Sequence, residues 1–213
     1  MGIKRAYSLA MELEFVTIDN NTYAKYLAYC HLPNLTVIPA SNTPPAVVFN
    51  RVMERSTSKY IAFIHSDVKC KGLVEAINRT IYQFQNFGAL GAVGATYDGI
   101  QWARKHESYP VLTIDSCLLI INREHRQYFD QENFDSYHLF VEEYCMRIRA
   151  KLGKDIRTIL IDGYEGEPTF IGADDYFAHM SNTVNQLGGS WGNYQRYHDK
   201  LKKCIQRSKQ QVQ

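Results

Sequence analysis

Short apolar runs alternate with amphipathic segments along the first 120 or so residues of the chain. Runs rich in apolar and β-branched residues, without a helical period, predict buried strands at 13–18, 35–38, 60–64 and 89–95. Between them, apolar residues recur every three or four positions, which predicts helices at 22–30, 46–55 and 72–87. Alternation of this kind is typical of a mostly parallel sheet with crossover helices, so we predict an α/β fold.

The second half of the chain is less regular and richer in glycine. Its predicted elements are a strand over 111–121 that is broken by Asp115, a short helix or turn at 124–128, a helix over 139–152 closed by Gly153, a strand over 156–161 and a last helix from about 194 to 208. We also expect the helix at 72–87 to end at Gly88 in the left-handed conformation. No repeat or linker is visible, which favours one domain over residues 1–213.

The composition and motifs of the chain argue against several classes of protein. Hydrophobic residues make up 45% and charged residues 22%, as in ordinary globular proteins. The net charge of +2 does not indicate that the protein binds nucleic acid. No apolar run approaches the roughly 20 residues of a membrane span, and the N-terminus does not read as a signal peptide. Five scattered cysteines without a Cys-x-x-Cys pair argue against zinc and disulfides, so we expect a cytoplasmic protein. Dinucleotide-binding and P-loop motifs are absent.

A polar cluster, His65-Ser66-Asp67, directly follows the predicted strand at 60–64. Open α/β sheets bind ligands at the carboxyl ends of their strands, and a carboxylate there can hold a divalent cation against a diphosphate. The alternative is that Asp67 caps the next helix. Asp19 poses the same choice between a ligand contact and an Asx turn. Asp115 interrupts an apolar strand and needs partners if buried, so we expect it to face a ligand.

Several segments carry a resemblance to a known family. In order, they are Phe15-Val-Thr-Ile-Asp-Asn20, Leu35-Thr-Val-Ile38, Asn42 with Ala46–Asn50, Tyr60–Val68, Leu90–Gly94, Thr113–Leu119, Phe129-Asp130 with a helix ending in Arg147, and His179. With these segments, residues 15 to about 200 resemble family 2-like glycosyltransferases of the GT-A fold. His65-Ser66-Asp67-Val68 looks like a His-x-Asp-Val variant of the family's Asp-x-Asp motif. Val141 stands where the family's usual base is found.

The resemblance implies a single GT-A, Rossmann-like domain with a mixed, mostly parallel central sheet flanked by helices. The nucleotide-binding half would span about 12–100, and the acceptor and metal-completing half about 101–200. The family usually has another strand before 13–18, so either the sheet is trimmed or this strand is the first. The implied activity is metal-dependent, inverting transfer of a hexose or deoxyhexose from a nucleotide diphosphate sugar, a UDP-sugar by preference, to a hydroxyl of a glycan or glycoprotein. The chain would be one domain of a larger transferase or a transferase by itself, of bacterial or viral origin.

The resemblance also assigns roles to residues of the donor site. Mn²⁺ or Mg²⁺ would be bound by Asp67, His179 and His65. His65 has alternative roles, as an orienting residue or as a hydrogen-bond donor to the diphosphate, and a lone histidine such as His179 is also a common structural residue. The donor itself would be contacted by Asp19, Asn42, Asn50, Ser66, Arg196 and Lys200. For Asn42 and Asn50 the alternative is that they hold loops.

The catalytic base should be a carboxylate within hydrogen-bond reach of the acceptor hydroxyl. Glu143 is our first choice, with Glu142 and Asp115 as the other candidates. Adjacent helical residues point about 100° apart, so only one of Glu142 and Glu143 should face the cleft. Alternatively, both lie on a solvated face of the helix.

The sequence is consistent with two other functions. A nucleotidyltransferase would also use a metal and a nucleotide, but the glycine-rich basic loop expected after its first strand is not seen. A non-catalytic domain that binds nucleotide or glycan is favoured by Val141 and by the missing strand.

Overall fold

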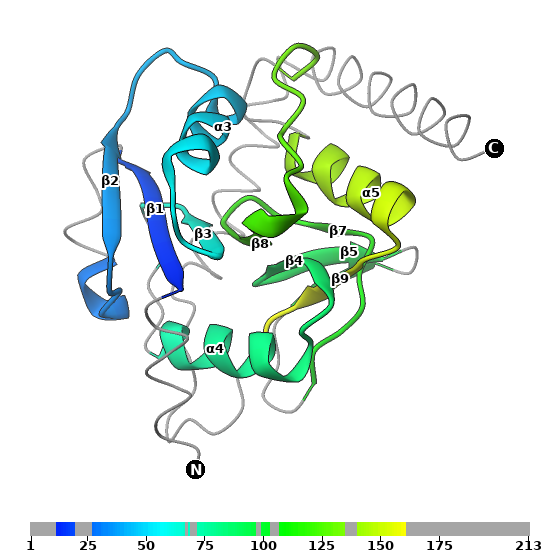
Figure 1. Cartoon of the computed structure of the whole chain (residues 1–213). Helices are drawn as coiled ribbons and strands as arrows, with labels where there is room; N and C mark the ends of the chain where they lie inside the picture. Colours follow the sequence, from blue (N-terminus) through cyan, green and yellow to red (C-terminus); the bar gives the residue numbers. More distant parts are fainter. Residues whose placement is uncertain are drawn as a thin grey trace.

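A six-stranded mixed sheet forms the centre of the molecule (Figure 1). The computed structural model describes residues 12–19, 27–66, 68, 72–96, 99–102, 107–134 and 140–160. In spatial order the strands are β2 (Leu35–Pro39), β1 (Leu13–Asp19), β3 (Tyr60–Ile64), β8 (Leu118–Asn122), β4 (Phe87–Gly91) and β9 (Asp155–Thr158). Of these six strands, only β8 runs antiparallel to its neighbours. The predicted α/β fold with a mostly parallel sheet is confirmed.

Helices cover both faces of this sheet, in keeping with the strict alternation of side chains along its central strands. On β3, Ile61 and Phe63 join the core cluster beneath α3 (Pro45–Arg55) and α5 (Phe140–Leu152). The alternate positions, such as Ala62, join the opposite cluster, which includes residues of α4 (Leu73–Gln83) and of the 3-10 helix η1 (Leu27–Cys30). Figure 1 shows α3 and α5 on one side of the sheet and α4 on the other. No helix in the described ranges is long and apolar enough to cross a membrane.

Local sequence accounts for most of these elements. Pro45 begins α3, where its missing N–H removes no helical hydrogen bond, and Gly153 follows α5 at a φ of 59°. The predicted strands at 13–18, 35–38 and 60–64 and the predicted helices at 46–55 and 139–152 are confirmed within one residue at each end. The predicted last helix near 194–208 lies outside the residues that the structure describes.

The prediction that Gly88 ends the preceding helix is wrong. Helix α4 already ends at Gln83, and Gly88 lies within strand β4. A Cβ atom at this position would lie 2.3 Å from Cγ2 of Ile148, so the glycine permits the close approach of α5 to the sheet. At α4 the glycine with left-handed backbone is Gly72, which has a φ of 74° and comes just before the helix.

The predicted strand at 89–95 is also corrected. It divides at Ala92 into β4 and a second strand, β5 (Val93–Thr96). Strand β5 pairs with β6 (Gly99–Trp102) and with β7 (Thr113–Ile114) in a small antiparallel sheet. The predicted strand at 111–121 is interrupted at Asp115 as expected, which separates β7 from β8. The described part of the predicted helix at 22–30 is η1 alone, and the short element at 124–128 is the 3-10 helix η2 (Arg123–His125).

The order of the strands creates a topological switch point between β1 and β3. The chain passes from β1 to β2 on one side and then crosses to β3 on the other side, with all three strands parallel. Connections that leave in opposite directions open a crevice at the carboxyl ends of such strands. Val16 is level with Phe63 in this pairing, so β1 and β3 end at the same edge of the sheet, near Asp19 and Ile64. In the described part of the chain, β1 is the first strand of the sheet.

We expect Gly91→Ala to destabilise the fold by overpacking the sheet. The added Cβ would lie 2.1 Å from Cγ2 of Ile114 and 2.6 Å from the carbonyl oxygen of Leu118, which belongs to the backbone of β8. The free energy of unfolding should fall by about 1–3 kcal/mol, measured by urea denaturation. Gly153→Ala is the control, because its space is open and it should cost only about 1 kcal/mol for left-handed backbone. An unchanged urea midpoint for Gly91→Ala would contradict this packing.

Candidate functional site

Polar side chains gather at the carboxyl edge of the sheet, beside the switch point. Asp19 is the last residue of β1, and His65 and Ser66 directly follow β3. Ser66 is buried and His65 is half-buried. The backbone N–H of His65 donates to the carbonyl oxygen of Cys117 at 3.0 Å, which ties the end of β3 to the turn that precedes β8.

Asp115 lies in that same turn, between β7 and β8. Its backbone N–H donates to the carbonyl oxygen of Val93 at 2.9 Å, and its Oδ1 accepts from the N–H of Cys117 at 2.7 Å. This Asx-type turn fixes the direction of the carboxylate. Because Cys117 also binds the backbone of His65, Asp115 belongs to the same edge of the sheet as the cluster that follows β3.

Glu143, in the first turn of α5, is held in a buried ion pair. Its side chain is 3% exposed, and its Oε1 and Oε2 accept from Nε and Nη2 of Arg147 at 2.6 Å and 3.1 Å. The same Nη2 also donates to the carbonyl oxygen of Tyr128 at 2.6 Å. Both carboxylate oxygens of Glu143 are therefore occupied by a guanidinium that also fixes the loop before Phe129.

Glu142 lies in a different environment from its neighbour. Burial, and then the negative charge of Asp115, raise the pKa of Glu142 to about 8, against a slight lowering by a backbone hydrogen bond. Carboxylates with pKa values shifted in this way by burial and by a second acid are candidates for chemistry. The structure thus brings Glu142 and Asp115 together and turns Glu143 toward Arg147.

Asn50 has a structural role in the described part of the chain. It is buried on α3 and bonds the backbone of Phe129 twice, donating to its carbonyl oxygen at 2.9 Å and accepting from its N–H at 2.8 Å. Its amide also donates to Oε1 of Gln131 at 3.0 Å. Asn50 therefore holds a loop, which is one of the two roles that we considered for it. Asn42 lies in the exposed connection between β2 and α3.

The other candidate residues lie outside the residues that the structure describes. They are Asp67, His179, Arg196 and Lys200. The described ranges hold no group of three or more His, Cys, Asp or Glu side chains able to bind a metal. In the sequence, His65 lies two residues before Asp67. An imidazole nitrogen and a carboxylate oxygen are both ligand types that Mn²⁺ accepts. The residues at the end of β3 therefore fit a divalent cation in their chemistry.

The ion pair between Glu143 and Arg147 was missed by sequence reasoning, although a signal for it exists. Glu followed by Arg four residues later on a helix is a favourable spacing, because the two side chains meet on one face. That spacing indicates that Glu143 is already paired and leaves Glu142 as the free carboxylate of the two.

The similarity of this chain to known proteins is confined to solved structures. No family model and no curated protein matches it. The structure of S. aureus TarS 1–349 in complex with UDP is 14% identical, with a TM-score of 0.48 over 76% of this chain and 54% of that chain. GalNAc-T7 with UDP, GalNAc and Mn²⁺ is 8% identical, with a TM-score of 0.49 over 73% of this chain and 44% of that chain. A197 from STIV is 11% identical, with a TM-score of 0.45 over 70% of this chain and 81% of that chain.

This chain therefore spans about half the length of the TarS 1–349 structures that it matches. At TM-scores below 0.5, these likenesses assign no ligand and no reaction to this chain.

We expect stability to fall with pH because of Glu142. Its pKa in the folded protein, about 8, lies above the ordinary value of 4.5, so the folded state keeps a proton that the unfolded state releases. The stabilisation is complete below pH 4.5 and is lost as the pH rises through about 8. Urea denaturation at about pH 5 and pH 8 should show this loss in the wild type and a smaller loss in Glu142→Gln. Glu54→Gln, at an exposed site on α3, is the control. Equal losses in all three proteins would contradict the environment of Glu142.

Proposed function

We propose that this chain is a metal-dependent glycosyltransferase domain of the GT-A type. It would transfer a hexose or deoxyhexose from a UDP-sugar to a hydroxyl group of a glycan or glycoprotein, with inversion. The observation that carries the proposal is the position of Glu142 and Asp115 beside the polar end of β3, at a topological switch point. The order of the resembling segments supports the choice of a nucleotide-sugar donor.

The donor would bind in the crevice between the carboxyl ends of β1 and β3. Asp19 would contact the nucleotide and Ser66 the diphosphate, with contributions from Asn42 in the next loop and from Arg196 and Lys200. Asn50 would act indirectly, through the loop that it holds. Asp67, His65 and His179 would bind Mn²⁺ or Mg²⁺, which supplies positive charge against the leaving diphosphate.

Glu142 is proposed as the general base in preference to Glu143. Both oxygens of Glu143 already accept hydrogen bonds from Arg147, whereas the pKa of Glu142, about 8, is close to the pH at which a base works best. The acceptor oxygen would form a bond to the anomeric carbon while the bond from that carbon to the diphosphate breaks on the opposite side. Glu142 would take the proton of the acceptor hydroxyl. Asp115 would keep the pKa of Glu142 high and lie near the donor sugar.

The donor site can be tested by calorimetric titration of UDP into the protein, with Mn²⁺ and with a chelator. We expect Mn²⁺-dependent binding in the wild type that is weakened about tenfold or more in Asp67→Ala. Asp155→Ala removes a carboxylate that is 73% exposed on β9 and should leave this binding unchanged. Binding that is indifferent to metal and to Asp67 would overturn the proposed donor site.

The base can be tested by comparing the neighbouring variants Glu142→Gln and Glu143→Gln in a transfer assay. Glu142→Gln should lower kcat by about 10²–10⁴-fold and leave the affinity for UDP unchanged, because only proton transfer is lost. In the wild type, kcat should rise with pH and level off near the pKa of Glu142, about 8. Glu143→Gln should keep this pH profile. Because Glu143→Gln also breaks the ion pair with Arg147, the base returns to Glu143 only if this variant keeps the wild-type urea midpoint and loses the pH dependence of kcat. UDP binding without transfer to any acceptor would indicate a non-catalytic binding domain.

A further inference from the structure

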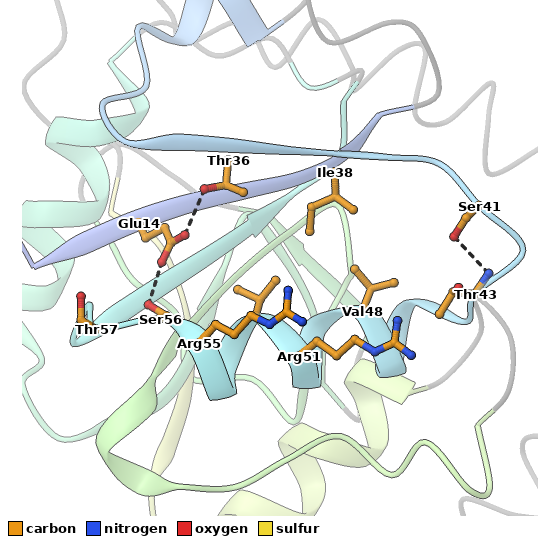
Figure 2. Close-up of a pocket in the computed structure, with 11 residues that line it drawn as sticks. Glu14, Thr36, Ile38, Ser41, Thr43, Val48, Arg51, Arg55, Ser56 and Thr57 are labelled. Atoms are coloured by element: carbon orange, nitrogen blue, oxygen red, sulfur yellow. Dashed lines mark hydrogen bonds between the residues drawn. The ribbon is translucent and has the colours of Figure 1, made fainter.

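A groove of about 530 Å³ lies between helix α3 and the strands β1 and β2, on the α3 face of the sheet (Figure 2). Its floor is apolar, formed by Ile38, Val48 and Val52. Hydroxyl groups also line it, contributed by Thr36 of β2, by Ser41 and Thr43 before α3, and by Ser56 and Thr57 after α3. None of these residues belongs to the carboxylate pair or to the polar end of β3.

Two arginines, Arg51 and Arg55, line this groove from α3. They are four residues apart and therefore neighbours on one face of the helix (Figure 2). Both are exposed. Within the described ranges, neither has an ion-pair or hydrogen-bond partner. Two like charges at this spacing repel each other, and an anion bound between them would remove that repulsion.

Glu14 is the one carboxylate among the residues that line the groove, and in the described part of the chain it forms no ion pair with these arginines. Glu14 lies at the end of the groove where α3 ends, and its Oε1 accepts from Oγ1 of Thr36 at 3.1 Å and its Oε2 from Oγ of Ser56 at 2.7 Å (Figure 2). Each oxygen of Glu14 is thus engaged by a hydroxyl group. The side chains that line the groove carry two positive charges and one negative charge, which leaves it net positive.

We propose that this groove is a second anion site, separate from the donor crevice, which binds a phosphate-bearing ligand through Arg51 and Arg55. A guanidinium presents a planar fork of donors that fits two oxygens of a phosphate. The two arginines are about 6 Å apart along the helix axis, and their guanidinium groups together offer more N–H donors than the two oxygens of one carboxylate can accept. A diphosphate or a pair of phosphates provides enough acceptor oxygens. The apolar floor offers room for an organic substituent, and the hydroxyl groups add further hydrogen bonds.

Calorimetric titration of inorganic pyrophosphate tests this site, with a chelator present so that metal-assisted binding in the donor crevice is absent. We expect the wild type to bind pyrophosphate. The double variant Arg51→Gln/Arg55→Gln should have an affinity at least about tenfold lower, because the charge-assisted hydrogen bonds of two guanidinium groups are lost. The matched control, Arg126→Gln/Lys151→Gln, removes two exposed charges elsewhere and should bind like the wild type. No binding by the wild type, or equal affinities in all three proteins, would overturn the proposal.

Two further arms identify the source of the phosphate. A soluble sugar phosphate and phosphatidylcholine vesicles that contain phosphatidylglycerol are each offered to the same three proteins. Binding that depends on the two arginines with the sugar phosphate alone assigns the site to a soluble phosphate ester, and such binding with the vesicles alone assigns it to a lipid headgroup.

The proposal does not depend on the donor site. Arg51→Gln/Arg55→Gln should retain Mn²⁺-dependent UDP binding, and Asp67→Ala should retain pyrophosphate binding in chelator, so that each site can fail alone.

Discussion

The bidentate ion pair between Glu143 and Arg147 is the interaction on which the candidate site depends. It uses the first turn of α5 and, through the carbonyl oxygen of Tyr128, the loop that precedes Phe129. Removing one partner would leave a buried charge unpaired, which is far more costly than losing an exposed pair. With Glu143 fixed in this way, the helical rotation of about 100° per residue turns Glu142 away from Arg147, and its charge interacts with Asp115.

The same loop is fixed from the other side by Asn50 and by a cluster of aromatic rings. Phe129 stacks on Tyr144 with ring centroids 4.6 Å apart, and Phe49 of α3 stacks on Phe63 of β3 at 3.8 Å. Edge-to-face contacts join Phe129 to Phe49 at 5.6 Å. Helices α3 and α5 are therefore joined through one loop, and the position of Glu142 is coupled to the packing of α3 on the sheet.

Most of the central fold could be predicted from the sequence because periodicity reports which side chains are buried. The strand at 60–64 and the helix at 139–152 are examples. Periodicity does not report how closely two elements approach, and so Gly88 was read as a helix end when its role is to admit Ile148. The pairing of Asp115 with Glu142 was also beyond sequence reasoning, because it depends on how α5 docks against the turn before β8. The carboxylates themselves were predicted as candidates because acids at strand ends and in a helical first turn are visible in the sequence.

Strand β8 has a consequence for how the protein forms during synthesis. It pairs with β3 on one side and with β4 on the other, and β3 and β4 are joined in the sheet only through it. A nascent chain that ends before residue 118 therefore carries both neighbours of β8 with exposed edges and apolar faces. The region that contains the switch point cannot complete its sheet until later residues leave the ribosome. A fragment cut near residue 100 would for the same reason lack the strand that joins β3 to β4.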